Sequence, residues 1–356
     1  MSELLCIDGA HGSGSGTIVR YAVALATLLG RSLHVVNVRA RRPQPGLRTQ
    51  HLASVLACAE LCGARVEGAH VGAKEFTYAP GGPPRGGSYA WRIGTAGSTT
   101  MLAFSVLPVA AWADAPVQAR ITGGLFQAFA PSPFHMAEVL RPLLHRMGLD
   151  FDLRIHRPGY FPKGGGEIEL TVQPVSRRLQ PLVLEDAGKV HHVRGIALAS
   201  HLAARQVSAR LADGCARQLE KGGLASTIER QEDTSAVQPG AALAVWAESS
   251  TGCIYGADQA GARGRRSEDI GCFVAQSFLE DLASGATVDR HAADMLILFA
   301  ALADGETRYI APQVTAHVET NLYLVRQFGA QVACSRGAMR VTGIGFEAWP
   351  SHGRAP

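Results

Sequence analysis

One helix–glycine–strand pattern occurs three times in this chain of 356 residues, and it constrains the fold more than any other feature. In each copy an amphipathic helix ends at a glycine and an apolar strand follows. The helices begin at three histidines and end 12 or 13 residues later at three glycines: His51, His135 and His317, then Gly63, Gly148 and Gly329. A second apolar helix that leads into a strand precedes each copy, with helices at 20–29, 99–112 and 294–303 and strands at 34–38, 117–121 and 307–310.

Each unit is therefore predicted to be β-α-β-α-β, with the units spanning residues 4–80, 88–174 and 280–346. Repetition of one supersecondary design is typical of an α/β fold in which stacked units cover one another's sheet faces. The third unit is displaced along the chain, which predicts an inserted α/β domain with a helix, a strand and a helix at 203–220, 242–249 and 270–283. Helix–glycine–strand segments are common in α/β proteins, so chance likeness between the copies stays an alternative.

These units define two domains. Residues 1–183 and 280–356 are predicted to form one three-repeat catalytic domain, and residues 184–279 the inserted domain. An apolar content of 47% and a charged content of 18% are typical of a globular chain and exclude a disordered one. The net charge of +4 is compatible with an anionic partner without requiring one.

Cysteine usage and hydropathy indicate the compartment. The seven cysteines are odd in number, and none of their spacings reads as a disulfide framework or as Cys-x-x-Cys. The first residues lack a basic segment followed by a cleavable apolar run, and no stretch reaches about 18 uninterrupted apolar residues. We therefore expect a reduced, cytoplasmic protein that does not span a membrane.

The segment 39–51 is rich in arginine and lies between an expected strand and an expected helix. It holds four arginines within ten residues, together with two prolines and a glycine that oppose helix formation. A guanidinium group is always charged and binds phosphate through two parallel hydrogen bonds, so this loop is a candidate phosphate clamp. The alternative is an ordinary solvated basic loop.

Two glycine-rich segments are further candidates for anion binding. The segment 8–16 follows the first strand, but it has Ser15 where a P-loop has lysine and Thr17 where a dinucleotide fingerprint has its third glycine. Its glycines still let backbone amides approach an anion at a helix N-terminus, although a tight turn explains them equally well. The segment 157–166 contains Lys163 and three consecutive glycines, a pattern that is typical of a hairpin or of an anion-binding site.

A histidine at a helix N-terminus can be a structural cap or a nucleophile. The positive end of the helix dipole disfavours the imidazolium form, and a neutral imidazole can accept a phosphoryl or nucleotidyl group. His51, His135 and His317 occupy equivalent positions in the three units, so spacing alone does not choose among them.

Several motifs, in order along nearly the whole chain, resemble those of the RNA 3′-terminal phosphate cyclases. They are Asp8-Gly-Ala-x-Gly, Arg39-Ala-x-Arg-x-x-Pro-Gly-Leu, Gln50-His-Leu, Gly94-Thr-Ala-Gly-Ser, Gly159-Tyr-Phe-Pro-x-Gly-Gly-Gly, Gly261-Ala-Arg-Gly-x-x-Ser-Glu, Ala293-Asp and His317-Val-Glu-Thr-Asn. The resemblance implies three repeated units as in the enolpyruvyl transferases, plus a small inserted domain. It also implies an ATP-dependent reaction in which a histidine is adenylylated, AMP passes to an RNA 3′-phosphate, and the 2′-hydroxyl closes a 2′,3′-cyclic phosphate.

The resemblance assigns roles to residues of this chain. His317 matches the nucleophile. The expected nucleotide-binding residues are Asp294, His291, Phe104, Pro131, His135, Gly12 and Gly14. The expected phosphate and RNA-end residues are Arg20, Arg39, Arg42, Gln50 and His51. The resemblance further implies ATP, a divalent metal (Mg²⁺ or Mn²⁺) and an RNA with a 3′-phosphate end, and it leaves the oligomeric state open, a homodimer included.

This chain departs from the family pattern in several positions. Ser13 stands where the family usually has a glutamate that helps with metal and triphosphate, so the metal ligands are unknown and Asp294 is one candidate. Gln44 replaces a frequent lysine. Phe104, His135 and His291 stand where glutamine, phenylalanine and tyrosine are common, which bears on nucleotide preference.

Two other functions are alternatives to the cyclase. A non-catalytic relative that binds RNA or assembles with ribosome-maturation proteins would lack the nucleophile, whereas this chain has His317. An enolpyruvyl transferase would carry an early Lys-Asn pair, and none occurs in 8–20.

Overall fold

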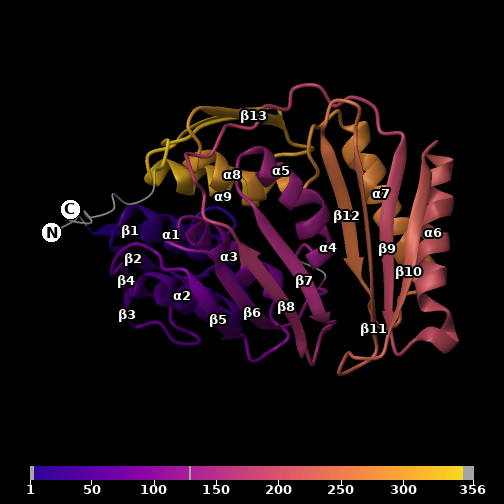
Figure 1. Cartoon of the computed structure of the whole chain (residues 1–356), viewed down its shortest axis with the longest axis horizontal. Coiled ribbons are helices and arrows are strands. Elements are labelled where there is room, and N and C mark those ends of the chain that lie inside the picture. Colours follow the sequence, from indigo (N-terminus) through magenta and orange to yellow (C-terminus); the bar gives the residue numbers. More distant parts are fainter. Residues whose placement is uncertain (1–3, 128–129, 348–356) are drawn as a thin grey trace.

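The computed structural model describes residues 4–127 and 130–347 of the chain. Its first unit consists of β1 (Leu5–Asp8), α1 (Gly16–Leu29), β2 (Leu33–Val36), α2 (Thr49–Cys62), β3 (Arg65–Glu67) and β4 (Phe76–Ala79). The four strands form one sheet in the order β1-β2-β4-β3 (Figure 1). β1 and β2 are parallel, and β4 is antiparallel to both of its neighbours.

The second unit repeats this topology. It consists of β5 (Gly87–Arg92), α3 (Thr99–Ala111), β6 (Val117–Gly123), α4 (Pro133–His135), a π-helical segment η1 (Met136–Leu140), α5 (Arg141–Arg146), β7 (Phe151–Arg157) and β8 (Gly166–Val172). The sheet order is β5-β6-β8-β7, with β5 parallel to β6 and β8 antiparallel to its two neighbours.

The third unit takes its first strand from the far side of the inserted segment. Its named elements are α8 (Ala292–Leu302), β13 (Glu306–Ile310), α9 (Ala316–Gln327), β14 (Gln331–Ser335) and β15 (Ala338–Thr342), with the sheet order β13-β15-β14. Residues 182–184 run parallel to β13 on its free edge: Arg308 N–H donates to the Leu182 carbonyl at 2.9 Å, and Leu184 N–H donates to the Arg308 carbonyl at 2.8 Å. This edge position is the one that β1 and β5 hold in the other units.

The α/β fold expected from the sequence is confirmed, but the order within each unit is not. Each of the first two units is β-α-β-α-β-β, because a hairpin and not a single strand follows the second helix. The third unit lacks a strand of its own directly before α8, since residues 182–184 supply that edge. The predicted β-α-β-α-β order is therefore wrong by one strand per unit.

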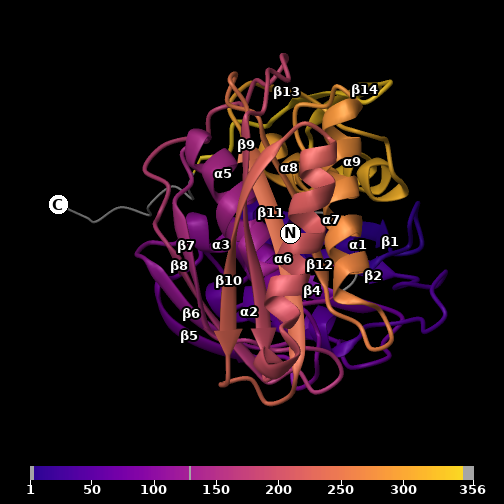
Figure 2. The ribbon, with the colours of Figure 1, turned by 90° about the vertical axis from the view of Figure 1, so that its right-hand side faces the viewer.

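Between residues 184 and 292 the chain forms a separate four-stranded sheet. Its elements are β9 (His192–Ser200), a 3₁₀ turn η2 (Ala203–Arg205), α6 (Val207–Lys221), β10 (Ala225–Asp233), β11 (Gly240–Glu248), β12 (Ile254–Ala260) and α7 (Ser267–Ala283). The strand order is β10-β9-β11-β12. Figure 2 shows α6 and α7 packed side by side in front of these strands. The sequence predicted both helices but only one of the four strands.

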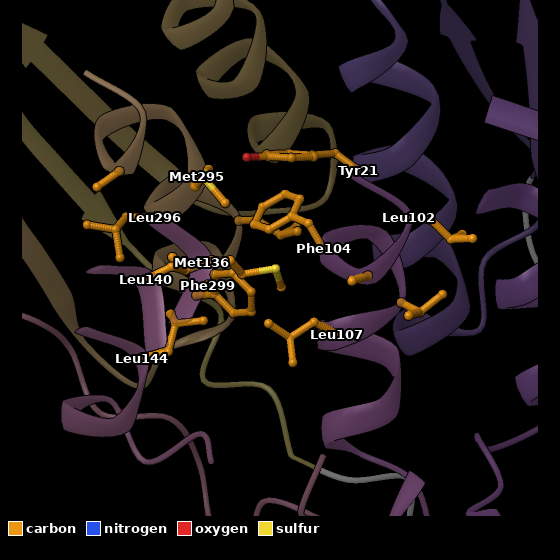
Figure 3. Close-up of a cluster of buried hydrophobic side chains, with 14 of the residues drawn as sticks. Tyr21, Leu102, Phe104, Leu107, Met136, Leu140, Leu144, Met295, Leu296 and Phe299 are labelled. Carbon is orange, nitrogen blue, oxygen red and sulfur yellow. The ribbon is translucent and has the colours of Figure 1, made fainter. Parts of the chain in front are cut away.

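The core lies where helices of the three repeated units meet. The helices α1, α3 and α8 are apolar on almost every side and are buried nearly throughout, which is the pattern of a helix surrounded by protein. The strands alternate instead, so that one face of each sheet packs inward, as in β6 and β8. In Figure 3, Tyr21 of α1, Phe104 of α3, Met136 of η1 and Phe299 of α8 point into one cluster.

The glycines that end the repeated helices adopt the backbone conformation expected of them. Gly63, Gly148 and Gly329 have φ values of 65°, 92° and 102°, a region that residues with a Cβ rarely occupy. Among the helices of the described residues, none combines the length and apolar character needed to cross a membrane.

Candidate active site

Three helix N-termini meet at one point of the repeated units. Ser15 is the N-cap of α1, and its Oγ lies 3.4 Å from Nδ1 of His317 in the first turn of α9, 302 residues away along the chain. The ring of His51, in the first turn of α2, packs against Gly16, where a Cβ would come within 2.0 Å of the His51 Nε2. Backbone N–H groups and helix dipoles at such termini favour an anion.

The glycine-rich loop between β1 and α1 closes on α9. Ser13 N–H donates to Thr320 Oγ1 at 2.8 Å. Gly12 has a φ of 54°, and a Cβ there would lie 2.3 Å from the same oxygen, so only glycine fits this approach. Gly14 packs against the Cβ of Arg41, whose Nη1 donates to the Gly12 carbonyl at 3.2 Å. The expected nucleotide-binding glycines therefore lie beside the helix that carries His317.

Arg20 is a partly buried cation at this junction. Its Nη2 donates to Thr17 Oγ1 at 3.2 Å, while its Nε is buried and has no hydrogen-bond partner among the described residues. Burial lowers the pKa of Arg20 from its ordinary value to about 10, although Tyr21 and Asp294 act in the opposite direction. A partly buried guanidinium with an unpartnered N–H is a group poised to bind an anion.

His317 is held towards its neutral form. The pKa of His317 lies below its ordinary value because of partial burial and then because of the nearby charges of Arg20 and Arg42. Thr315 caps α9 by accepting from Val318 N–H at 3.2 Å, which fixes the helix start that carries the ring. At neutral pH the imidazole keeps a lone pair, as a nucleophile requires.

His51 is also neutral but is enclosed. Its Nδ1 accepts from Arg48 N–H at 3.2 Å, which leaves the proton on Nε2. Burial and then Arg20 hold the pKa of His51 well below its usual range. The adjacent Gln50 accepts from Ser98 N–H at 2.9 Å through Oε1 and so ties α2 to the N-terminus of α3. Of these two helix-start histidines, His51 is buried while His317 is partly exposed.

The arginines of the segment 39–51 divide into two groups. Arg39 has a φ of 53°, and its Nη1 donates to the carbonyls of Gln44 and Gly46 at 2.8 and 2.9 Å, so it braces the loop. Arg41 contacts the glycine-rich loop, as described above. Arg42 acts through its charge, which lowers the pKa of both His317 and His51. Of the predicted phosphate residues, Arg20 and Arg42 thus lie near His317. Arg39 also lowers the pKa of His51, and Gln50 lies beside the His51 ring.

Asp294 lies in the first turn of α8, near Arg20. Burial raises the pKa of its carboxyl to about 7, even though Arg20 acts to lower it. Its backbone carbonyl accepts from the Tyr21 hydroxyl at 2.7 Å and from Asn321 Nδ2 at 3.2 Å. These contacts join α1, α8 and α9 directly behind the cluster.

His135 and His291 form a second cluster beside Asp294. Nε2 of His135 lies 3.0 Å from the Asp289 carboxylate, which also accepts from the backbone N–H of Gly256 and of His291. Burial alone would lower the pKa of His135, but Asp289 outweighs it and the pKa is raised. Burial lowers the pKa of His291. The His291 ring lies edge-on to the His135 ring, with 5.5 Å between the two ring centroids. Nδ1 of His135 is buried without a partner among the described residues.

Two other predicted nucleotide-binding residues have packing roles. Phe104 is 2% exposed and lies between Tyr21 and Phe299, each with its ring centroid 5.8 Å away (Figure 3). Pro131 is buried, and its carbonyl accepts from Thr100 Oγ1 at 2.8 Å. Contact of either residue with a nucleotide stays a prediction.

Metal ligands are sparse at this junction. In the described part of the chain, no group of three or more His, Cys, Asp or Glu side chains is arranged to hold a metal ion. At position 13 the chain offers a hydroxyl, which donates to Ser15 Oγ at 3.0 Å, and Asp294 is the carboxylate beside Arg20.

Sequence reasoning missed four residues that shape this region. Ser15 and Thr320 connect the glycine-rich loop to α9, Tyr21 connects α1 to α8, and Asp289 orients His135. The N-cap preference of serine before a helix was a readable signal for Ser15. Thr320 belongs to the motif that begins at His317, although its contact with the glycine-rich loop cannot be read from that motif. Nothing in the sequence marks Tyr21 or Asp289, because their partners lie far away along the chain.

Comparison with known proteins gives a consistent result. The family model described as RNA 3′-terminal phosphate cyclase matches residues 11–333. Proteins named RNA 3′-terminal phosphate cyclase are similar to this chain in Hyperthermus butylicus (39% identical, 97% of this chain and 99% of that one) and in Pyrobaculum aerophilum (35%, 96% and 98%). The solved enolpyruvyl transferase NikO from Streptomyces tendae matches 98% of this chain and 50% of its own, with 12% identity and a TM-score of 0.42. By the extent of the family match and the identity to these relatives, the chain belongs to the RNA 3′-terminal phosphate cyclase family.

Proposed function

We propose that this chain is an ATP-dependent enzyme that converts an RNA 3′-terminal phosphate into a 2′,3′-cyclic phosphodiester. Family membership and the names of the relatives support the activity. The observation that carries it in this chain is the position of His317, which is neutral, partly exposed and placed where the N-termini of α1, α2 and α9 meet beside Arg20.

The proposed first step is covalent adenylylation. His317 attacks the α-phosphorus of ATP, an N–P bond forms, and the bond to pyrophosphate breaks. When Nδ1–H donates to Ser15 Oγ, the Nε2 lone pair is free for this attack. Arg20 and Arg42 stabilise the negative charge that develops on the transferring group, and the N–H groups of α1 add to this effect.

In the second and third steps the RNA end replaces His317. An oxygen of the 3′-phosphate attacks the adenylyl phosphorus and frees the histidine, which gives a mixed anhydride. The ribose 2′-hydroxyl then attacks the terminal phosphorus, loses its proton, and AMP leaves. Adenylylation is needed because a phosphate oxygen alone is a poor leaving group. We place the 3′-phosphate near Arg42, Gln50 and His51.

The residues at the junction fit a triphosphate better than a caged metal. The unpartnered Nε of Arg20 and the three helix N-termini suit phosphate oxygens. A divalent cation would be held by phosphates and by Asp294, and it would neutralise charge on the departing pyrophosphate. We also propose residues 1–183 and 280–356 as the catalytic domain and residues 184–279 as the inserted domain.

The activity is tested with a short RNA that carries a 3′-phosphate. With ATP and Mg²⁺ or Mn²⁺, the end should become resistant to phosphatase as one AMP is released per end. A matched RNA with a 3′-hydroxyl should release none. His317→Ala should be inactive, while His145→Ala, a change of an exposed histidine on α5, should behave like the wild type. Absence of cyclic ends under both metals would contradict the proposal.

A further inference from the structure

One large apolar side chain is displayed on the loop between β7 and β8. Phe161 is 78% exposed, more than any other large hydrophobic residue among those described. It lies in the segment 157–166, whose lysine and glycines the reaction steps above leave without a role. Single exposed hydrophobic residues are common on proteins, so exposure alone indicates nothing.

The loop that carries Phe161 is anchored on both sides. The preceding Tyr160 is 4% exposed, stacks on Phe126 at 5.4 Å, and has its hydroxyl 2.8 Å from Ser200 Oγ. Nε2 of Gln238, from the inserted segment, donates to the carbonyls of Tyr160 and Phe161 at 2.9 and 2.8 Å. The outward aromatic ring is therefore carried by a backbone that is already ordered, which lowers the entropy lost on binding.

The same loop touches the segment next to the candidate active site. Gly164 lies against residues 95–96, where a Cβ would come within 2.9 Å of the Ala96 Cα. Thr95 Oγ1 in turn lies 2.9 Å from Thr49 Oγ1, in the first turn of α2, two residues before His51. The loop that carries Phe161 is thus linked, through residues 95–96, to the start of α2 that bears the proposed RNA-end residues.

The charge around Phe161 suits a polyanion. Lys163 is exposed, and no carboxylate lies within salt-bridge distance of it in the described residues. Arg157 holds the other side of the loop through Nε, which donates to the Gly165 carbonyl at 2.6 Å. An exposed aromatic ring with an exposed cation two residues along the same loop suits single-stranded nucleic acid, since bases stack on aromatic rings and cations attract phosphates.

We propose that Phe161 is a stacking platform for a base of the RNA upstream of its 3′-phosphate, with Lys163 binding an adjacent phosphate. This inference rests on the proposed function, because it takes the RNA end to lie at His51 and His317. The platform accepts any base, since every base offers a flat face, so it contributes affinity and register without sequence preference.

The test uses 3′-phosphorylated RNAs in which one base at a time is replaced by 2-aminopurine, whose fluorescence falls on stacking. Binding is measured without ATP, so the result does not depend on catalysis. Wild type should quench the probe at one or two positions upstream of the end. Phe161→Ala should abolish that quenching and weaken RNA binding by about 5- to 150-fold, the range of a lost base–aromatic stack. Phe161→Trp should retain both.

Matched controls separate stacking from general damage. Phe273→Ala removes another exposed phenylalanine, which packs under Arg265 in the inserted domain, and should change neither measurement. RNA with an abasic site at the quenched position should bind wild type as weakly as intact RNA binds Phe161→Ala, and the two losses should not add. Adenylylation of His317 needs no RNA, so Phe161→Ala should keep it.

The outcomes are distinct for the two proposals. Unchanged RNA affinity and unchanged quenching in Phe161→Ala would overturn the stacking platform, and a protein partner would then be the better occupant of this surface. Additive losses for the variant and the abasic RNA would overturn it as well. If the wild type forms no His317 adduct, the proposed function is contradicted. The RNA-binding measurement would still test whether Phe161 is a stacking platform.

Discussion

Arg20 should destabilise the ligand-free protein, because the charge that we expect to bind a phosphate is partly buried. A base whose pKa falls on folding binds its proton less tightly in the folded state, so charged Arg20 destabilises the fold at every pH below about 10. The fall of the Arg20 pKa from its ordinary value to about 10 corresponds to about 3 kcal/mol. Arg20→Met keeps a long side chain, removes the partly buried charge and lets the Asp294 carboxyl stay protonated.

We therefore expect Arg20→Met to raise the free energy of unfolding by about 1–3 kcal/mol in the absence of ligand, as replacement of buried charges by apolar groups often does. Urea unfolding followed by circular dichroism at pH 6 measures this. Added pyrophosphate at a hundred times its Kd should stabilise wild type by about 2.7 kcal/mol. Pyrophosphate should stabilise the variant only slightly, because the variant lacks the guanidinium group that binds the anion.

Arg31→Met is the matched control, since Arg31 lies just beyond the other end of α1 and is exposed. It should change stability by less than about 0.5 kcal/mol and keep the response to pyrophosphate. The reasoning is refuted if Arg20→Met destabilises the free protein by several kcal/mol, or if pyrophosphate stabilises the variant as much as the wild type.

Three further predictions follow from the same region. Asp294→Asn should remove a pH dependence of stability. The pKa of Asp294 in the folded state, about 7, exceeds the ordinary 3.8, so the free energy of unfolding of the wild type falls as pH rises through that interval. In urea unfolding, the free energy of unfolding of the variant should therefore rise relative to that of the wild type, by up to about 4 kcal/mol at pH 8. Equal pH slopes for the two proteins would count against this. Ser13→Glu should lower the Mg²⁺ or Mn²⁺ concentration that gives half-maximal adenylylation, because it adds a carboxylate beside the α1 N-terminus; a change in neither metal need nor rate would show that position 13 is unimportant. Phe104→Ala should destabilise the protein by about 3–5 kcal/mol in thermal or urea unfolding, as a buried ring between Tyr21 and Phe299, and a loss below 1 kcal/mol would contradict that placement.

The repeated pattern was enough to predict the α/β fold because periodicity and glycine stops are local signals. Residues around Gly63, Gly148 and Gly329 behave as expected in all three units. The first strand of the third unit was missed, because residues 182–184 and β13 are neighbours only in space, on opposite sides of the inserted segment. No local pattern could reveal that pairing.

In the candidate site, too, the sequence predicts local features but not contacts between residues that are distant along the chain. Arginine-rich composition and position pointed to the segment 39–51, yet only the structure distinguishes Arg39, which binds loop carbonyls, from Arg42, whose charge reaches His317. Spacing could not choose among the three helix-start histidines. Their surroundings differ: His51 is enclosed, and His135 is bound to Asp289, a partner 154 residues away.

In the proposed reaction, His317 forms the covalent bond to AMP. The direct measurement is incubation of the protein with α-labelled ATP and a divalent cation, followed by a search for label that is stable to alkali and labile to acid, as a phosphoramidate is. We expect such label on wild type and on His51→Ala, and none on His317→Ala. Absence of label on wild type, or equal label on His317→Ala, would contradict it.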